Sequence, residues 1–560
     1  MHWLLEICNA RKGENAMNKM IRAICTAVFF AASAATADER TWVGESGGSW
    51  YVAANWSPSG VPGETDTVVF SPANELTVTI SGGTSVCRAG VIRFESGTTY
   101  FAYDSSAVGL YMGSTVTNIL HVAEGAEAVL SNRFMTVSGK RFRRTGKGKL
   151  TVVPRSNDWW HYAPANDFPG MDFVEGETIL EVGTASNQNY PLYRLPIHIC
   201  SGAVIRCKAS YRLRTDQNIV IDRGGVLDMG KHDQYAQSIT GEGVVTNHSA
   251  VIMTLKAGAC TFAGQFFKTG TGPDVHFQAR PSGMSDEDWA FVIGGSNTFA
   301  KSRLTQPAGA GNTIRFAPGV GDFWIQELIG STKQYLTLED TNGDPVTVRG
   351  GFYNSTTVPR FKGKGNFLLY SMSAYIRSSD VVTNMTGSLG ASGGATLTIG
   401  NDTAATWPDI SGLGGFIVER GTVAFKNENV EDSTIHGTTV FRDAGAKMTA
   451  TAALAFGAGS TVRFEISKSG LGSGVTPIKA PTISFNATSA LEADVAAYRE
   501  TLGKKATLKL AEASSALNLP DEVLANANAD SFANGYRFRK DGKTLLLDVS
   551  RPGGFIITLR

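Results

Sequence analysis

The stretch that decides the fold runs from Gln237 to Phe262 and reads QSITGEGVVTNHSAVIMTLKAGACTF. It contains a Gly-x-Gly turn, a short apolar run, a polar step, a second apolar run, another glycine turn and a third apolar run. The runs are too short for helices and are rich in Val and Ile, so they predict β-strands. Because segments of this kind recur at a loose spacing, the pattern indicates the coils of a β-solenoid.

Turn glycines upstream of this stretch show the repeat most clearly. Gly148, Gly176, Gly202, Gly225 and Gly243 are separated by 28, 26, 23 and 18 residues. Each opens a strand of four to six residues dominated by Val, Ile and Leu. We expect each glycine to supply the positive φ of a tight corner between strands.

The pattern resumes between residues 311 and 467, where its last unit alternates strictly. In GAGSTVRFEIS, Val462, Phe464 and Ile466 alternate with polar residues that include Arg463 and Glu465. Successive side chains of a strand point to opposite faces, so the three apolar residues are predicted to enter the core and the two charged residues to face water.

These motifs resemble a known family. RRTGKGKLTVV followed by GETILEVG, and GGVLDMGKHDQYAQSITGEGVVTNHSAVIMTLKAGACTFAGQF, are similar to the autotransporter-associated β-strand repeat, most clearly from about Arg144 to Phe266. The resemblance implies an all-β, right-handed parallel β-helix in a secreted or surface, passenger-like bacterial protein. That family shares no catalytic residues, so the resemblance assigns no residue a role.

Residues 1–37 are predicted to be a secretory signal peptide. Lys19 and Arg22 precede the apolar run 23–34, and Ala35-Thr36-Ala37 gives the small-x-small pattern of a cleavage site. The apolar run is shorter than the roughly 20 residues that span a bilayer, so no membrane span is expected in the mature chain. We therefore expect a secreted or cell-surface protein, with the periplasm as the alternative location.

The remaining chain divides into three predicted regions. They are an N-terminal cap with the first coils at 38–135, the repeats at 136–470 and a β-rich C-terminal cap at 471–560. The whole chain carries 51 Lys and Arg against 50 Asp and Glu. A net charge of +1 gives no indication of a nucleic-acid partner.

Aromatic residues mark the expected N-terminal cap. Trp42, Trp50, Tyr51 and Trp56 are clustered where the first coil would otherwise expose its apolar cross-section, and terminal repeats must be capped. A sugar-stacking platform is the alternative interpretation of this cluster.

At the C-terminal end, GYRFRKDGKTLLLDV predicts a β-hairpin with Asp541-Gly542 as its two-residue turn. A last strand is expected at 554–560, and a helix after Pro520.

Four cysteines follow the signal peptide: Cys87, Cys200, Cys207 and Cys260. Each is interpreted as a small buried hydrophobe. A bridge between Cys200 and Cys207 is the alternative, since the intervening SGAVIR either brings the two together or leaves them on separate edges. No metal spacing is found among the cysteines and histidines, so no metal ligand or cofactor is predicted.

The candidate ligand-binding residues are Trp159, Trp160 and Tyr162, in the sequence DWWHY. This aromatic and acidic cluster falls in the longest glycine spacing, which predicts a loop extending from the coil, and flat rings beside carboxylates suit sugar stacking. Packing of the rings onto their own coil is the alternative. Asp340-Thr-Asn-Gly-Asp resembles the start of a calcium loop, but Pro345 and Gly351 occupy its required Gly and Glu positions, so a polar turn is favoured.

The function expected from the sequence is that of a structural or adhesive rod, with extracellular glycans or cell-surface components as partners. Asp and Glu are scattered singly, so no catalytic residue is predicted. Stacked coils can still gather residues that are distant in sequence. A polysaccharide lyase or glycoside hydrolase on the same fold is therefore the alternative.

Overall fold

The computed structural model describes residues 38–550 with several internal gaps. The segments outside the description are 81–86, 104–108, 113–117, 132, 137–140, 154–169, 182–195, 214–216, 249–251, 256–259, 269–273, 278–290, 306–313, 330–334, 353–358, 378–380, 383, 401–407, 427–433, 443–444, 468–475, 502–504 and 531–534.

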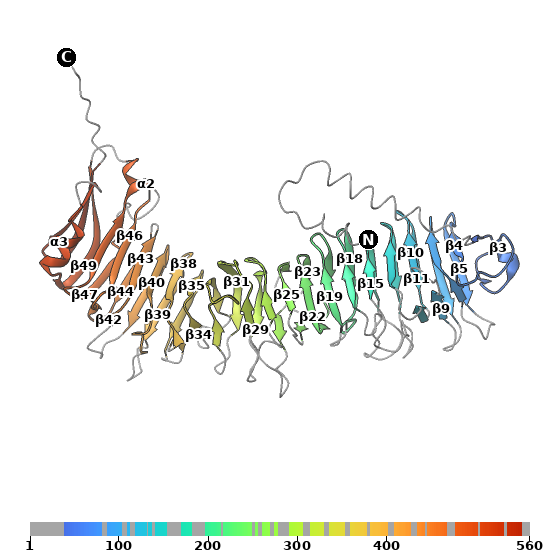
Figure 1. Ribbon diagram of the computed structural model, residues 1–560, viewed down its shortest axis with the longest axis horizontal. Coiled ribbons are helices and arrows are strands. Elements are labelled where there is room, and N and C mark those ends of the chain that lie inside the picture. The colour runs from blue at the N-terminus through green and yellow to red at the C-terminus, as the bar shows by residue number, and fades with distance from the viewer. Residues whose placement is uncertain are drawn as a thin grey trace, which may run out of the picture.

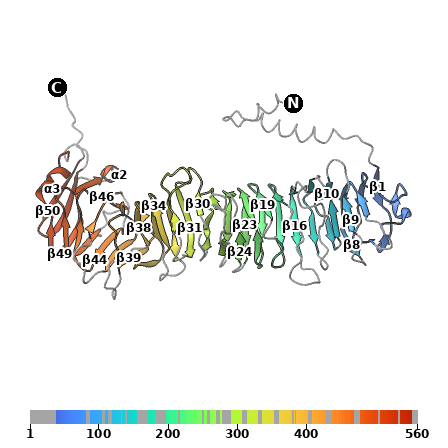
Figure 2. The same cartoon turned by 60° about the horizontal axis from the view of Figure 1, so that its bottom comes forward.

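The molecule is a rod of stacked β-strands. Strands make up 59% of the described residues and helices 4%, which confirms the predicted all-β class. Figures 1 and 2 show the strands stacked side by side along the long axis, with β3 at one end and α3 at the other. None of the helices in the described part of the chain has the length and apolar character needed to cross a membrane.

Sheet A forms one wall of the N-terminal half of the rod, and its strands are parallel except for β3. In spatial order they are β3 (Trp56–Ser57), β1 (Glu39–Trp42), β4 (Thr67–Phe70), β7 (Val91–Phe94), β10 (Asn118–Val122), β13 (Phe142–Thr145), β15 (Met171–Phe173), β17 (Ile197–Ile199), β19 (Asn218–Ile221), β22 (Ser238–Gly241), β25 (Cys260–Phe262), β28 (Phe291–Ile293) and β30 (Ile314–Phe316).

Sheet B forms the second wall and contains the strands that the turn glycines predict. Its members are β2 (Gly48–Ser49), β5 (Glu75–Ile80), β8 (Thr98–Tyr103), β11 (Glu127–Leu130), β14 (Lys149–Val152), β16 (Gly176–Leu180), β18 (Ala203–Cys207), β20 (Val226–Asp228), β23 (Val244–Asn247) and β26 (Gln265–Lys268). The five strands from β14 to β23 are consecutive neighbours, so the predicted repeat is confirmed.

The prediction that all five turn glycines adopt a positive φ is confirmed at only two of them. Gly176 and Gly202 have φ of 75° and 86°. Gly148 and Gly243 have no positive φ and are required by close approach instead. A Cβ on Gly148 would stand 2.2 Å from the carbonyl oxygen of Ala123, and one on Gly243 would stand 2.2 Å from the Ile221 side chain.

Sheet C and the first three strands of sheet D, β21, β24 and β27, form the third wall of the N-terminal half. Sheet C contains β6 (Cys87–Ala89), β9 (Gly109–Met112) and β12 (Arg133–Thr136). Sheet D contains β21 (Gln234–Ala236), β24 (Ile252–Leu255), β27 (Asp274–Phe277), β29 (Phe299–Thr305), β31 (Asp322–Ile329), β33 (Thr347–Phe352), β35 (Asn366–Tyr370), β38 (Ser388–Ser392), β40 (Gly415–Glu419), β43 (Thr438–Arg442), β46 (Thr461–Glu465) and β48 (Ala490–Asp494).

Strand β29 joins the two walls, because it bonds both to β26, the last strand of sheet B, and to β27 of sheet D. The backbone N–H of Phe266 in β26 donates to the Thr298 carbonyl at 2.9 Å, and the Ser302 hydroxyl donates to the Phe266 carbonyl at 2.6 Å. Residues 303–305 of the same strand pair with β27 of sheet D. The wall of sheet B therefore continues as sheet D through the second half of the rod.

Two further sheets complete the C-terminal half. Sheet E contains β32 (Tyr335–Thr337), β34 (Arg360–Gly363) and β37 (Asn384–Met385). Sheet G contains β36 (Ser373–Ile376), β39 (Thr396–Gly400), β41 (Thr422–Lys426), β44 (Lys447–Ala450), β47 (Ile478–Phe485), β49 (Lys505–Asn518), β51 (Thr544–Ser550) and β50 (Tyr536–Asp541), with β42 (Thr434–Ile435) and β45 (Leu454–Phe456) beside it.

One connected hydrophobic core runs from Trp42 to Val549 along the inside of the rod. Val462 and Phe464 are fully buried and Ile466 nearly so, while the Arg463 side chain is 43% exposed. The predicted inward and outward faces of this strand are confirmed.

A buried arginine interrupts the apolar interior. Arg144 lies on the inner face of β13 and is 0% exposed. Its guanidinium donates to the backbone carbonyls of Gly146, Gly148, Glu175 and Glu177, which line the corner between two stacked coils. Burial lowers the Arg144 pKa to about 10, against the opposing charges of Glu175 and Glu177.

The tryptophans at the N-terminal end close the core, as predicted for a cap. Trp50 and Trp56 are almost completely buried and pack edge to face at 4.8 Å. The Trp56 indole N–H donates to the Trp50 carbonyl at 2.9 Å. Their burial makes the alternative of a sugar-stacking platform wrong for these two rings.

Antiparallel strands and a helix close the C-terminal end. Strands β50 and β51 form the predicted hairpin, and β51 also pairs antiparallel with β49. Asp541 pairs with Thr544, so the two turn residues are Gly542 and Lys543, one position beyond the predicted pair. Gly542 supplies the positive φ of 56° that the turn needs.

The predicted helix after Pro520 is α3 (Asp521–Ala527). It is preceded by the short α2 (Ala496–Arg499) and, near the N-terminus, by a 3-10 turn at Ala53–Asn55. The last strand expected at 554–560 and the signal peptide at 1–37 lie outside the described residues.

Cys87, Cys200 and Cys207 are free thiols. Cys200 follows β17 of sheet A, whereas Cys207 ends β18 of sheet B. The two therefore stand on separate walls and form no bridge. The side chain of Cys260 lies outside the description.

Candidate functional site

The predicted ligand-binding residues Trp159, Trp160 and Tyr162 lie within 154–169, outside the described residues. The predicted polar turn at Asp340 is confirmed. One Asp340 carboxylate oxygen accepts hydrogen bonds from the backbone N–H groups of Asn342 and Asp344, at 2.8 and 3.0 Å. The carboxylate therefore holds the turn itself.

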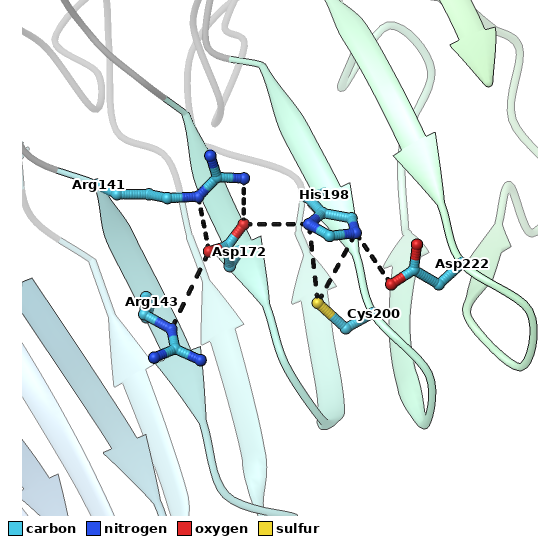
Figure 3. Close-up of polar contacts among 6 residues, drawn as sticks. All are labelled: Arg141, Arg143, Asp172, His198, Cys200 and Asp222. Atoms are coloured by element: carbon cyan, nitrogen blue, oxygen red, sulfur yellow. Dashed lines mark hydrogen bonds and ion pairs between the residues drawn. The ribbon is translucent and has the colours of Figure 1, made fainter. Parts of the chain in front are cut away.

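A histidine, a cysteine and two aspartates meet on the outer face of sheet A (Figure 3). Asp172 projects from β15, His198 and Cys200 come from β17 and the residue after it, and Asp222 follows β19. Figure 3 shows His198 between the two carboxylates. We call His198, Cys200 and Asp222 the His-Cys-Asp cluster, because their ligand atoms all lie within 4.8 Å of one another.

The imidazole contacts one carboxylate through each nitrogen. Nδ1 lies 3.2 Å from Asp172 Oδ1, and Nε2 lies 3.0 Å from Asp222 Oδ2. Asp172 also accepts hydrogen bonds from both Nε and Nη2 of Arg141, at 2.6 and 2.5 Å. Arg143 Nε is 4.0 Å from the same carboxylate. The arginines fix Asp172, and Asp172 in turn orients the imidazole.

The Cys200 thiol is poorly placed to act as a nucleophile. Its sulfur is almost equidistant from the two ring nitrogens of His198, at 3.9 and 4.0 Å, so neither nitrogen is aimed at it. Burial, followed by the charges of Asp172 and Asp222, raises the Cys200 pKa to about 11. A nucleophilic cysteine needs a lowered pKa and an aligned base. The cluster therefore does not favour thiol catalysis.

Sequence reasoning did not find this cluster because its members are one coil apart. Asp172 and His198 are separated by 26 residues, and His198 and Asp222 by 24. The separation of 26 equals the spacing from Gly176 to Gly202 and was the available signal for Asp172 and His198, whereas Asp222 lies two positions beyond Val220, the register partner of His198. Residues one period apart on the outward face of a parallel strand become neighbours in the stack.

A second group of side chains lies on the outer face of sheet D. Trp324 of β31 and Tyr370 of β35 contact edge to face at 5.2 Å. The Arg349 guanidinium of β33 lies 5.7 Å from the centre of the Trp324 ring. We call Trp324, Tyr370, Arg349 and Glu419 the aromatic wall patch. Tyr370 is 42% exposed, so part of its ring faces solvent.

Charge pairing holds this patch together along the wall. Arg349 donates to Glu419 of β40 across the intervening strands β35 and β38, and Arg442 of β43 donates to the same carboxylate at 2.9 Å. Burial alone would raise the Glu419 pKa, but the hydrogen bonds and charges of the two arginines outweigh it and lower that pKa below its ordinary value. Glu419 is therefore a carboxylate at neutral pH.

Gly390 stands in register with Leu368, which pairs with Arg349, and with Ile417, two positions before Glu419. A Cβ on Gly390 would stand 1.8 Å from the Ile417 carbonyl oxygen, so the close approach of the backbone requires glycine here.

Comparisons with protein-family models, with curated proteins and with solved structures find no match. The class defined by the fold is the parallel β-solenoid.

Proposed function

We propose that the chain is a secreted structural or adhesive β-solenoid of the autotransporter-associated repeat type, whose side walls bind extracellular glycans. The observation that carries the proposal is the aromatic wall patch. It presents the exposed Tyr370 ring and the half-buried Trp324 ring on one outer wall, beside the charged pair Arg349 and Glu419.

The chemistry of the patch suits a sugar. Aromatic faces stack on the apolar C–H face of a pyranose ring, while a few fixed polar groups bind its hydroxyls. A guanidinium and a carboxylate held by each other offer both donors and acceptors at positions that do not need to rearrange. An open wall also suits a polymer, which can lie along the rod without entering a cavity.

The interior supports the structural part of the proposal. The core is continuous from Trp42 to Val549, so the inside of the rod is filled by side chains. Contacts with other molecules then fall to the outward positions of the strands. A long wall of repeated outward positions is the kind of surface that repeat proteins use for binding.

Glycan-array binding by the chain from residue 38 onward tests the proposal. Trp324→Ala combined with Tyr370→Ala should lower affinity about 5- to 150-fold, since each ring contact contributes about 0.5 to 1.5 kcal/mol. Tyr335→Ala is the matched control, because Tyr335 is also a half-buried wall aromatic under an arginine, with Arg360 at 5.7 Å, but lies on sheet E.

Three outcomes would contradict the proposal. Absence of binding by the unmodified chain, or equal losses in the double variant and in Tyr335→Ala, would exclude the patch as a glycan surface. Release of reducing sugar in a parallel assay would favour the lyase or hydrolase alternative. Secretion is tested separately by N-terminal sequencing of the exported protein, for which we expect Asp38 as the first residue.

A further inference from the structure

We propose that the His-Cys-Asp cluster is a zinc-class metal site on the outer wall of sheet A, with His198 Nε2, Cys200 Sγ and Asp222 Oδ2 as its three protein ligands. The proposal is independent of the glycan function, because the cluster lies on a different wall from the aromatic patch. It rests on the ligand geometry, the identity of the donors and the group that supports the imidazole.

The spacing of the ligand atoms is close to that of a tetrahedral site. Bond lengths of about 2.3 Å to sulfur and 2.0 to 2.2 Å to nitrogen and oxygen place neighbouring ligand atoms roughly 3.3 to 3.6 Å apart. Here His198 Nε2 is 3.0 Å from Asp222 Oδ2 and 4.0 Å from Cys200 Sγ. These values lie on either side of the ideal, so a modest rotation of the Cys200 side chain closes the site.

The donor set selects among metals. Thiolate sulfur and imidazole nitrogen suit zinc and its neighbours in the transition series, while calcium and magnesium prefer oxygen ligands only. The side chains of His198 and Asp222 are 29% and 45% exposed, so a fourth position opens to solvent. Three protein ligands with an open position describe a zinc site that keeps a water molecule or accepts a ligand from another molecule.

The surroundings of His198 supply the second, independent observation. Metal-binding histidines donate their other ring N–H to a carboxylate or carbonyl, which fixes the tautomer and orients the ring. Asp172 Oδ1 lies 3.2 Å from Nδ1, and Arg141 holds Asp172 with two hydrogen bonds. Asp172 is therefore placed to accept a hydrogen bond from Nδ1–H when Nε2 binds a metal ion.

The test uses the chain from residue 38 onward, stripped of metal by a chelator and titrated with Co²⁺. We expect one Co²⁺ per chain with a thiolate-to-metal charge-transfer band, and its displacement by Zn²⁺. Cys200→Ser should remove the band, and Asp222→Asn should weaken Zn²⁺ binding at least tenfold. Asp172→Asn should keep the band while affinity falls about 10- to 100-fold, the range for partners that support a ligating histidine.

The chain offers a matched control in His248, whose Nε2 lies 3.2 Å from Asp228 Oδ2. Its replacement by Ala should leave Co²⁺ and Zn²⁺ binding unchanged. Circular dichroism checks that each variant remains folded, and Asp222→Asn replaces Cys200→Ser as the deciding variant if the latter does not fold. No charge-transfer band in the unmodified chain, or equal Zn²⁺ affinity in the unmodified chain and in both ligand variants, would overturn the proposal.

Discussion

Replacing Phe464 by Ala perturbs the core at one known rung. The Phe464 side chain is fully buried in β46, and its ring stacks on Phe441 of the preceding rung at 5.3 Å with 13° between the planes. Truncation of a buried phenylalanine costs about 3 to 5 kcal/mol, including the cavity left behind. Backbone ladders on both sides of β46 fix the spacing of the rungs, so the cavity cannot collapse and we expect the upper part of this range.

Arg463→Ala is the matched control on the same strand. Arg463 faces outward, its side chain is 43% exposed, and its ion pairs with Glu465 and Glu492 span 3.5 and 4.0 Å. Exposed pairs of this kind contribute about 0 to 1 kcal/mol. Neighbouring residues of one strand should therefore differ in cost by several kcal/mol, solely because their side chains point to opposite faces.

Hydrogen exchange measured by mass spectrometry is the suitable assay, because the units of a repeat protein can open locally. In Phe464→Ala, amides of β43, β46 and β48 should exchange roughly 700- to 4000-fold faster, since each 1.4 kcal/mol is tenfold in the opening equilibrium. The distant strand β4 should be unaffected in both variants. Equal exchange of the three rungs in Phe464→Ala and Arg463→Ala would refute the assignment of faces.

Three further predictions concern single residues. Arg144→Met removes the donors that four buried carbonyls share, so the free energy of unfolding in chemical denaturation should fall by at least about 3 kcal/mol. The loss should be concentrated in β13 and β16, and a smaller change would show that water replaces the guanidinium. Glu419 has a lowered pKa in the folded chain, so its contribution to stability is present above the ordinary pKa of 4.5 and is lost as the pH falls through the folded value. The difference in thermal stability between the unmodified chain and Glu419→Gln should thus shrink between pH 7 and pH 3, and a constant difference would contradict the pairing with the two arginines. Gly387→Ala places a Cβ 1.7 Å from the carbonyl oxygen of Gly365, so soluble yield and melting temperature should both fall, and unchanged values would show that the corner can widen.

The repeat was predictable because short β-branched runs and turn glycines are local features. The strands from β14 to β23 stack in the predicted order since each glycine marks the same corner of successive coils. The reason for each glycine was less accessible. Glycine is required by a positive φ at position 176 and by the close approach of a neighbouring coil at position 243, and the sequence shows glycine in both cases. Only the positions of the stacked neighbours distinguish the two reasons.

The charged interior and the two wall clusters depend on contacts between coils, which no single segment contains. Alternation places Arg144 on the inner face of β13, but two of its four carbonyl partners, those of Glu175 and Glu177, belong to the next coil. His198 stands in register with Asp172 of the preceding coil, whereas its register partner in the following coil is Val220, and Asp222 lies two positions further on. Coil lengths vary between 18 and 28 residues in the glycine spacing, so sequence distance alone could not decide which outward residues meet.

The antiparallel strands at the two ends also bear on whether a second molecule can extend the ladder. A parallel ladder with bare ends would be a template on which a second molecule adds rung by rung, producing a filament of unlimited length. At one end β3 pairs antiparallel with β1, and at the other the outermost strand β50 presents Arg537, Arg539 and Lys540 to solvent. The antiparallel pairing and the charged edge therefore disfavour the addition of another parallel rung to sheet A at one end and to sheet G at the other.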